Sequence, residues 1–144
     1  EKVVQPEAAT GEASIRGLHL LLAEDNELNA EIAARLLNDE GATVQVVRDG
    51  QQAIDAFASR PQGTYDAILM DIMMPKIDGY TATRVIRSTN RQDAKTIPII
   101  AMTAHVFDED VKQCLEAGMN AHLPKPLQME KVVSTIARLC KRKK

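Results

Sequence analysis

Five short apolar runs alternate along the chain with longer segments in which apolar residues return every three or four positions. The short runs have the length of β-strands buried on both faces, whereas the three-to-four spacing is typical of amphipathic helices. The predicted strands are Leu18–Ala23, Thr43–Val47, Ala67–Met70, Ile97–Met102 and Ala121–Leu123. Their regular alternation with helices predicts a parallel sheet covered on both faces.

The helical segments carry local start and stop signals. The first is predicted over residues 26–40, with Asn26 as its cap and Gly41 as its stop. Its periodic apolar positions are Leu28, Ile32, Leu36 and Leu37. The later helices are predicted over residues 52–59, 80–88, 108–117 and 128–139.

Length and composition predict one folded domain between two polar ends. The 144 residues are enough for a sizeable core without disulfides or structural metals. Residues 1–17 are rich in small and polar residues and lack apolar periodicity, which predicts a linker or disordered arm. Residues 18–140 form the predicted domain, and residues 141–144 are a basic tail that we interpret as a solvated end.

Charge and cysteine usage exclude several classes of protein. The 18 basic and 20 acidic residues leave a net charge of −2, which predicts no general attraction to nucleic acid or to an anionic membrane. No apolar stretch approaches the length of about 20 residues that spans a bilayer. Cys114 and Cys140 lie far apart and match neither a metal motif nor a disulfide framework, which favours a reducing, cytoplasmic location.

Acidic residues stand where two of the predicted strands end. Asp71 directly follows the run Ala67–Met70, and Glu24 and Asp25 follow the first run. If the two strands are neighbours in a parallel sheet, three carboxyl groups converge at one sheet edge, where open α/β sheets bind ligands. Like charges so close repel one another unless a cation joins them, and an all-oxygen cluster suits Mg²⁺ (or Mn²⁺).

Short motifs at the ends of the five strands, taken together, resemble those of a response-regulator receiver domain. They are Glu24-Asp25, Asp71 with Met73-Met74-Pro75 and Asp78-Gly79, Thr103-Ala104, and Lys125-Pro126. The resemblance extends over residues 18–139. It implies a flavodoxin-like (CheY-like) three-layer α/β/α fold with a five-stranded parallel sheet of strand order 2-1-3-4-5.

The resemblance also implies phosphoryl transfer from a phosphohistidine to Asp71. A carboxylate at a strand end can attack phosphorus in line and hold the group as an acyl phosphate. Asp25, Glu24 through a water molecule, Asp71 and the backbone carbonyl of Met73 would hold Mg²⁺. Taken singly, Asp71 would also be acceptable as a turn cap, and Glu24 as an ordinary exposed acid.

Other motif residues take supporting roles in this family. Lys125 would bring its positive charge to the phosphoryl oxygens, and the Thr103 hydroxyl would swing to hydrogen-bond the phosphoryl group. Pro126 resembles the family's cis-proline, which aims the lysine inward, and Gly79 belongs to the turn after the acceptor strand. The plainer alternatives are a surface lysine and a threonine that caps the next segment.

Two positions depart from the family pattern or vary within it. His122 stands three residues before Lys125, where the family usually has a Tyr or Phe that rotates inward behind the threonine. It either takes part in switching, with a charge that titrates near neutral pH, or only fills space at the sheet edge. Met73, two residues after Asp71, would hinder water and favour a phosphoryl lifetime that is not short.

Two of three competing classes of function lack residues that they need. A haloacid-dehalogenase-like phosphatase places a second aspartate two residues after its nucleophile, where this chain has Met73. A flavin-binding flavodoxin relative needs a phosphate loop after the first strand, where Asp25 and Glu27 would repel the anion. A receiver-like binding scaffold that never takes a phosphoryl group remains an alternative, although all the site residues are present.

The residues around the motifs are similar to those of receivers attached to hybrid sensor histidine kinases. This predicts a fragment of such a kinase, with a kinase phosphohistidine as donor and a histidine phosphotransfer domain as the next acceptor, docked over the first helix. Phosphorylation would change the face between the fourth and fifth helices. A free-standing single-domain response regulator is the alternative. By itself the segment would be a phosphoacceptor with at most self-dephosphorylation activity.

Overall fold

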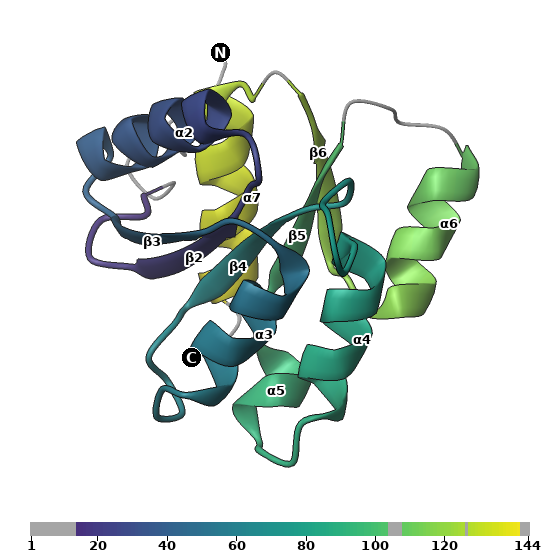
Figure 1. The fold of residues 1–144 in the computed structure, drawn as a ribbon. Helices are drawn as coiled ribbons and strands as arrows, with labels where there is room; N and C mark the ends of the chain where they lie inside the picture. Colours follow the sequence, from purple (N-terminus) through teal and green to yellow (C-terminus); the bar gives the residue numbers. More distant parts are fainter. Residues whose placement is uncertain (1–13, 104–107, 126, 142–144) are drawn as a thin grey trace.

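The fold is an α/β/α sandwich, described here from a computed structural model over residues 14–103, 108–125 and 127–141. One parallel sheet of five strands runs through its centre in the order β3-β2-β4-β5-β6 (Figure 1). The strands are β2 (His19–Ala23), β3 (Thr43–Val47), β4 (Ala67–Asp71), β5 (Ile99–Thr103) and β6 (Ala121–Pro124). Counted along the chain, this is the predicted order 2-1-3-4-5, so the predicted fold class is confirmed.

Helices connect successive strands and cover both faces of the sheet. They are α2 (Glu27–Asp39), α3 (Gly50–Ala58), α4 (Gly79–Ser88), α5 (Asp93–Thr96), α6 (Asp108–Ala117) and α7 (Met129–Lys141). The short helix α5 was not predicted, because four residues are too few to show a helical period. It begins beside a salt bridge of 2.8 Å between Arg91 and Asp93.

Alternate residues of the strands face two separate cores. On one face, Leu21, Ile68 and Ile99 pack against α3, α4 and α6. On the other face, Leu20, Leu69 and their neighbours pack against α2 and α7. Successive side chains of a strand point to opposite faces, so runs apolar at every position fill both cores. None of the helices in the described part of the chain has the length and apolarity that a membrane crossing needs.

The packed unit begins before the predicted boundary. Ile15, which sequence analysis assigned to the arm of residues 1–17, is fully buried in the core beneath α2 and α7. Gly17 then makes a turn with a φ of 85°, and its amide donates a hydrogen bond to the carbonyl of Gly41. The segment from Ser14 is therefore part of the folded domain, ahead of the first strand.

Three helices start immediately after a strand or its loop because a side chain caps each one. The side-chain oxygens of Asn26, Asp49 and Asp78 each accept a hydrogen bond from the amide three residues further on. Such caps satisfy amides that the first helical turn leaves without partners. The caps keep the connections short at the carboxyl end of the sheet, so side chains from several loops are held close together there.

Candidate functional site

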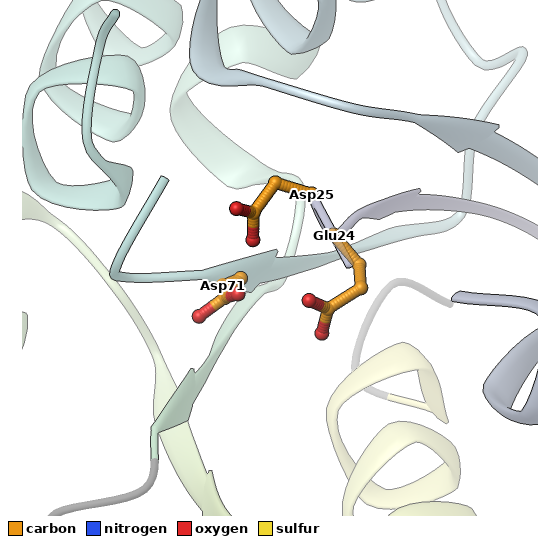
Figure 2. Close-up of side chains that lie close together, drawn as sticks. All are labelled: Glu24, Asp25 and Asp71. Carbon is orange, nitrogen blue, oxygen red and sulfur yellow. The ribbon is translucent and has the colours of Figure 1, made fainter. Parts of the chain in front are cut away.

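Three carboxylates meet at the carboxyl ends of β2 and β4 (Figure 2). The register pairs Ala23 with Met70, so the next residues, Glu24 and Asp71, lie side by side. Glu24, Asp25 and Asp71 each offer an oxygen atom, and these atoms lie within 4.8 Å of one another. Glu24 and Asp71 are buried, whereas Asp25 is exposed, so the cluster is open to solvent on one side.

Lys125 supplies a positive charge to this cluster. Its ammonium donates hydrogen bonds to Oε1 of Glu24 at 2.8 Å and to Oδ2 of Asp71 at 3.0 Å. Lys125 directly follows β6, and its backbone amide donates to the carbonyl of Thr103, which extends the pairing of β6 with β5. The side chain therefore reaches over the end of β5 to the acids on β2 and β4.

Burial changes the protonation of the central pair. Removal from water raises the pKa of Asp71 to about 6; the hydrogen bond from Lys125 opposes this rise and the charge of Glu24 adds to it. Burial alone would lower the pKa of Lys125, but its hydrogen bonds to Glu24 and Asp71 raise it above its usual value. At neutral pH the site therefore holds a carboxylate that gains from any added positive charge.

Glu24 is fixed by two contacts rather than exposed at a strand end. Its Oε1 accepts from Lys125, and its Oε2 accepts from the backbone amide of Asn26 at 3.1 Å. From the sequence, Asn26 was predicted only as a helix cap, and this contact of its amide was not predicted. The tight turn from β2 into α2 explains it, because the turn folds the chain back over the Glu24 side chain.

Strand β4, which ends at Asp71, is followed by a tight turn that needs a glycine. A Cβ atom on Gly79 would lie 2.5 Å from the carbonyl oxygen of Asp71, closer than such atoms approach in proteins. The amide of Gly79 donates to the carbonyl of Ile72, and the amide of Met73 donates to Oδ1 of Asp71 at 3.2 Å. The first turn of α4 is thereby packed directly against the candidate acceptor.

The remaining predicted site residues take various positions. Thr103 is buried at the end of β5, one residue beyond Met102, the register partner of Asp71. Met73 is 73% exposed beside the acids. His122 is half-buried on β6 and lines a cavity of about 330 Å³ together with Arg138. Pro126 and Ala104 lie outside the described residues.

Helix α2 presents an apolar stripe to solvent beside the acids. Leu28 is 63% exposed and Ile32 is 49% exposed, with Leu36 continuing the stripe. The apolar periodicity of the sequence includes these three residues. In the structure, however, the buried residues of α2 are Ala30, Ala33 and Leu37. A cavity of about 380 Å³ lies next to the stripe, lined among others by Ile32, Leu127 and Lys125.

Comparison with known proteins places this arrangement in a family. Residues 20–137 match the response regulator receiver domain. Histidine kinase 1 of Arabidopsis thaliana is 38% identical over 158 residues, covering 89% of this chain and 13% of the kinase. The osmosensing histidine protein kinase SLN1 of Saccharomyces cerevisiae is 39% identical over 125 residues, covering 84% of this chain and 10% of that protein. The chain thus spans a small part of the length of these relatives.

A solved structure agrees with the family match. The receiver domain of sensor histidine kinase PA1611 from Pseudomonas aeruginosa has a TM-score of 0.78 and 38% identity, covering 87% of this chain and 98% of that chain. Its crystal structure has a magnesium ion coordinated in the active site cleft. From its fold, its acidic sheet edge and these relatives, this chain belongs to the response regulator receiver domain family and is a receiver domain of two-component phosphorelay signalling.

Proposed function

We propose that this receiver takes a phosphoryl group from a phosphohistidine onto the carboxylate of Asp71. The observation that supports this most strongly is the set of contacts around that carboxylate, which is buried at a strand end and hydrogen-bonded to Lys125. A carboxylate oxygen attacks phosphorus, the P–N bond to the donor imidazole breaks, and the imidazole nitrogen takes the bonding electron pair. An acyl phosphate on Asp71 is the product.

Lys125 fits the role of stabilising the charge of the transferred group. Negative charge on a phosphoryl group in transit is spread over its oxygens, so a fixed ammonium beside the acceptor lowers the barrier. The ammonium is already within hydrogen-bond distance of Asp71, and Glu24 holds it from a second side. Lys125 therefore needs little movement to meet the incoming group.

The acidic cluster fits Mg²⁺, and Mn²⁺ would suit the same donors. Glu24 through a water molecule, Asp25, Asp71 and the carbonyl of Met73 would hold the ion. Three carboxylate oxygens within 4.8 Å of one another, one of them with its pKa raised to about 6, form a hard and electron-rich donor set. When bound, the ion neutralises charge on the phosphoryl oxygens.

Thr103 and His122 are the candidates for relaying the modification. The position of Thr103 at the end of the strand next to β4 is compatible with a hydrogen bond from its hydroxyl to a phosphoryl group on Asp71. His122 lies on the strand beyond, in register with Ala101. A shift of Thr103 toward the phosphoryl group would change the packing near His122 and so alter the face between α6 and α7.

The partner that we propose is a histidine phosphotransfer domain docked on α2. The stripe of Leu28, Ile32 and Leu36 is exposed and apolar, and it lies beside the acids. Helices of a phosphotransfer domain could cover it while presenting their histidine to Asp71. The kinase relatives support an origin in a hybrid sensor histidine kinase, whose own phosphohistidine is the donor; a free-standing receiver is the alternative. The chain's two cysteines fit a cytoplasmic location.

Intact mass spectrometry tests the phosphoacceptor assignment. The chain and its Asp71→Asn variant are incubated with acetyl phosphate, with and without Mg²⁺. We expect the original chain to gain the mass of one phosphoryl group only when Mg²⁺ is present, and the variant to gain none. If the original chain gains no mass from acetyl phosphate or from a phosphorylated histidine phosphotransfer domain, it is a receiver-like binding scaffold and the proposal is wrong.

A further inference from the structure

The loop between β4 and α4 carries part of the proposed site. It contains Met73, whose carbonyl is a proposed metal ligand, and it begins directly after Asp71. Within the loop, the amide of Ile77 donates a hydrogen bond of 2.8 Å to the carbonyl of Pro75. The path of this loop therefore decides where a metal-binding carbonyl lies relative to the acceptor carboxylate.

The loop contains a strained backbone. Lys76 has a φ of 68° and, among the described residues, is the one residue other than glycine with a positive φ. A side chain in this left-handed conformation costs about 1 kcal/mol or more, so it persists only where surrounding contacts maintain it. The loop thus needs an external support that keeps it in this path.

The amino end of α3 provides that support. A Cβ atom on Gly50 would lie 2.2 Å from the carbonyl oxygen of Ile77, so the loop backbone rests directly on the Cα of this glycine. Beside it, Asp49 Oδ2 lies 3.6 Å from the ammonium of Lys76, while Asp49 Oδ1 caps the helix. The Asp49 side chain is buried, which fixes its position. Both contacts join the amino end of α3 to the loop.

We propose that Gly50 is a positioning residue for phosphoryl transfer, because its lack of a side chain lets the β4–α4 loop, and through it the Met73 carbonyl, keep its place against α3. This inference rests on the function proposed for Asp71. Any side chain at position 50 would push the Ile77 carbonyl outward, since real Cβ atoms keep at least 3.0 Å from their neighbours. A displacement of about 1 Å at a reacting centre costs up to about a hundredfold in rate, and Mg²⁺ demands near-ideal geometry.

The Gly50→Ala variant tests this role by Mg²⁺ affinity and by phosphorylation kinetics, both well below the melting temperature. NMR titration of the apo protein gives the Mg²⁺ dissociation constant, and intact mass gives the limiting rate and half-saturation with acetyl phosphate. We expect Mg²⁺ binding to weaken about fivefold or more and the limiting rate to fall about tenfold or more. Amide exchange at Ile77 and Gly79 should also quicken, because their loop has lost its fixed path.

Gly118→Ala is the matched control. Gly118 has a φ of 105°, and an added Cβ would lie 3.1 Å from Cγ of Arg87, so this variant is also strained and destabilised. Gly118 lies in the turn between α6 and β6, away from the β4–α4 loop. We expect it to lose stability while keeping the Mg²⁺ dissociation constant and the limiting rate. Equal losses in the two variants would mean that general destabilisation is the cause, and the inference would be wrong.

The remaining outcomes separate this inference from the proposed function. If the original chain takes no phosphoryl group, the function assigned to Asp71 is wrong. If the original chain works and Gly50→Ala stays within twofold of it, the positioning role is wrong. Should Gly50→Ala not fold, the double variant with Lys76→Gly lets the loop yield at its strained residue, and the same weakening is expected there. If neither variant folds, Gly50 is needed for the packing of the fold itself, and the positioning role is wrong.

Discussion

Lys125 donates a hydrogen bond of 3.0 Å to Asp71, across 54 residues of sequence. The same ammonium also bonds Glu24, so one cation is shared between two buried carboxylates. A divalent ion entering the cluster must compete with this ammonium for the same oxygens. The lysine that we propose to assist phosphoryl transfer is therefore expected to oppose metal binding, and the two effects can be separated experimentally.

Lys125→Gln should tighten Mg²⁺ binding while slowing phosphorylation. Removing a positive charge beside the ion strengthens its attraction to the carboxylates by about 1 kcal/mol, or about fivefold in dissociation constant. The transferred phosphoryl group loses its ammonium, so the rate with acetyl phosphate should fall. NMR titration and intact mass measure the two effects. Lys131→Gln, an exposed lysine on α7, is the control. Weaker Mg²⁺ binding in Lys125→Gln would contradict the competition.

Asp71→Asn should stabilise the metal-free protein near neutral pH. The pKa of Asp71 is raised from 3.8 to about 6, so the folded state holds a proton more firmly than the unfolded chain does. The contribution of this group to the free energy of unfolding therefore falls as the pH rises from about 4 to about 6, and the penalty persists above that range. We expect the free energy of unfolding of Asp71→Asn to exceed that of the original chain by about 1 to 2 kcal/mol at pH 7.5, and by less at pH 4.

Urea denaturation at the two pH values, with chelator present, measures this difference. Asp55→Asn, on the exposed side of α3, is the control for loss of one carboxylate. A gain of equal size at both pH values would show that the charge of Asp71 is not its cause. Absence of any gain at pH 7.5 would show that burial does not penalise this carboxylate.

Leu28→Ser together with Ile32→Ser should impair transfer from a protein donor and leave acetyl phosphate unaffected. Both side chains are exposed, so the free energy of unfolding should change by less than about 0.5 kcal/mol. The rate from a phosphorylated histidine phosphotransfer domain should fall about tenfold, since apolar anchors dominate such interfaces. Leu115→Ser is the matched control, because Leu115 is equally exposed at 63% but lies on α6. Equal losses in both variants would argue against docking on α2.

Thr83→Val should raise stability. Within the described residues, the Thr83 hydroxyl is the buried side-chain group that has no hydrogen-bond partner, and its side chain is fully buried in α4. Valine keeps the shape and removes the unsatisfied group, which should add about 1 kcal/mol to the free energy of unfolding. Thr81→Val, exposed on the same helix, should change it little. Thermal and urea denaturation provide the measurement; a loss of stability at position 83 would reveal a hydrogen bond to an internal water molecule.

Arg87→Met should be strongly destabilising. Its guanidinium donates to the carbonyls of Gly118 and Ala94 and to Oδ1 of Asn120, at distances between 2.8 and 3.2 Å. Burial lowers the pKa of Arg87. Truncation leaves several acceptors without donors, at a cost of about 2 to 4 kcal/mol. Arg84→Met is the control, because Arg84 is exposed on the same helix, and it should change the free energy of unfolding little. An equally small change for Arg87→Met would show that these hydrogen bonds contribute little.

Local patterns were sufficient to predict the sheet and its acidic edge. Apolar runs mark buried strands, and an acid that interrupts such a run has to lie where the strand leaves the core. The position of Asp71 could therefore be predicted from its neighbours in sequence alone. The strand order that brings Lys125 close to the acids came from the family resemblance, since no local pattern contains it, and the contact of Lys125 with Glu24 was not predicted.

Contacts between distant segments could not be predicted. The periodicity of α2 correctly indicated a helix, but Leu28 faces solvent, because Ala30 and Ala33 occupy the side that packs closely on the sheet. The loop that holds the left-handed Lys76 lies against the amino end of α3, from which it is separated along the chain by β4. Small residues that allow close packing, and strained residues that distant contacts support, cannot be recognised from the sequence alone. They are identified only in the three-dimensional structure.

The bond between Glu24 and Lys125 joins residues 101 positions apart, which follow β2 and β6, the first and last strands of the described sheet along the sequence. A fragment that lacks Glu24 or Lys125 cannot form this bond. During synthesis this bond can form only after β6 and Lys125 have been made. The charged site is in this way completed only when the last strand of the sheet is in place.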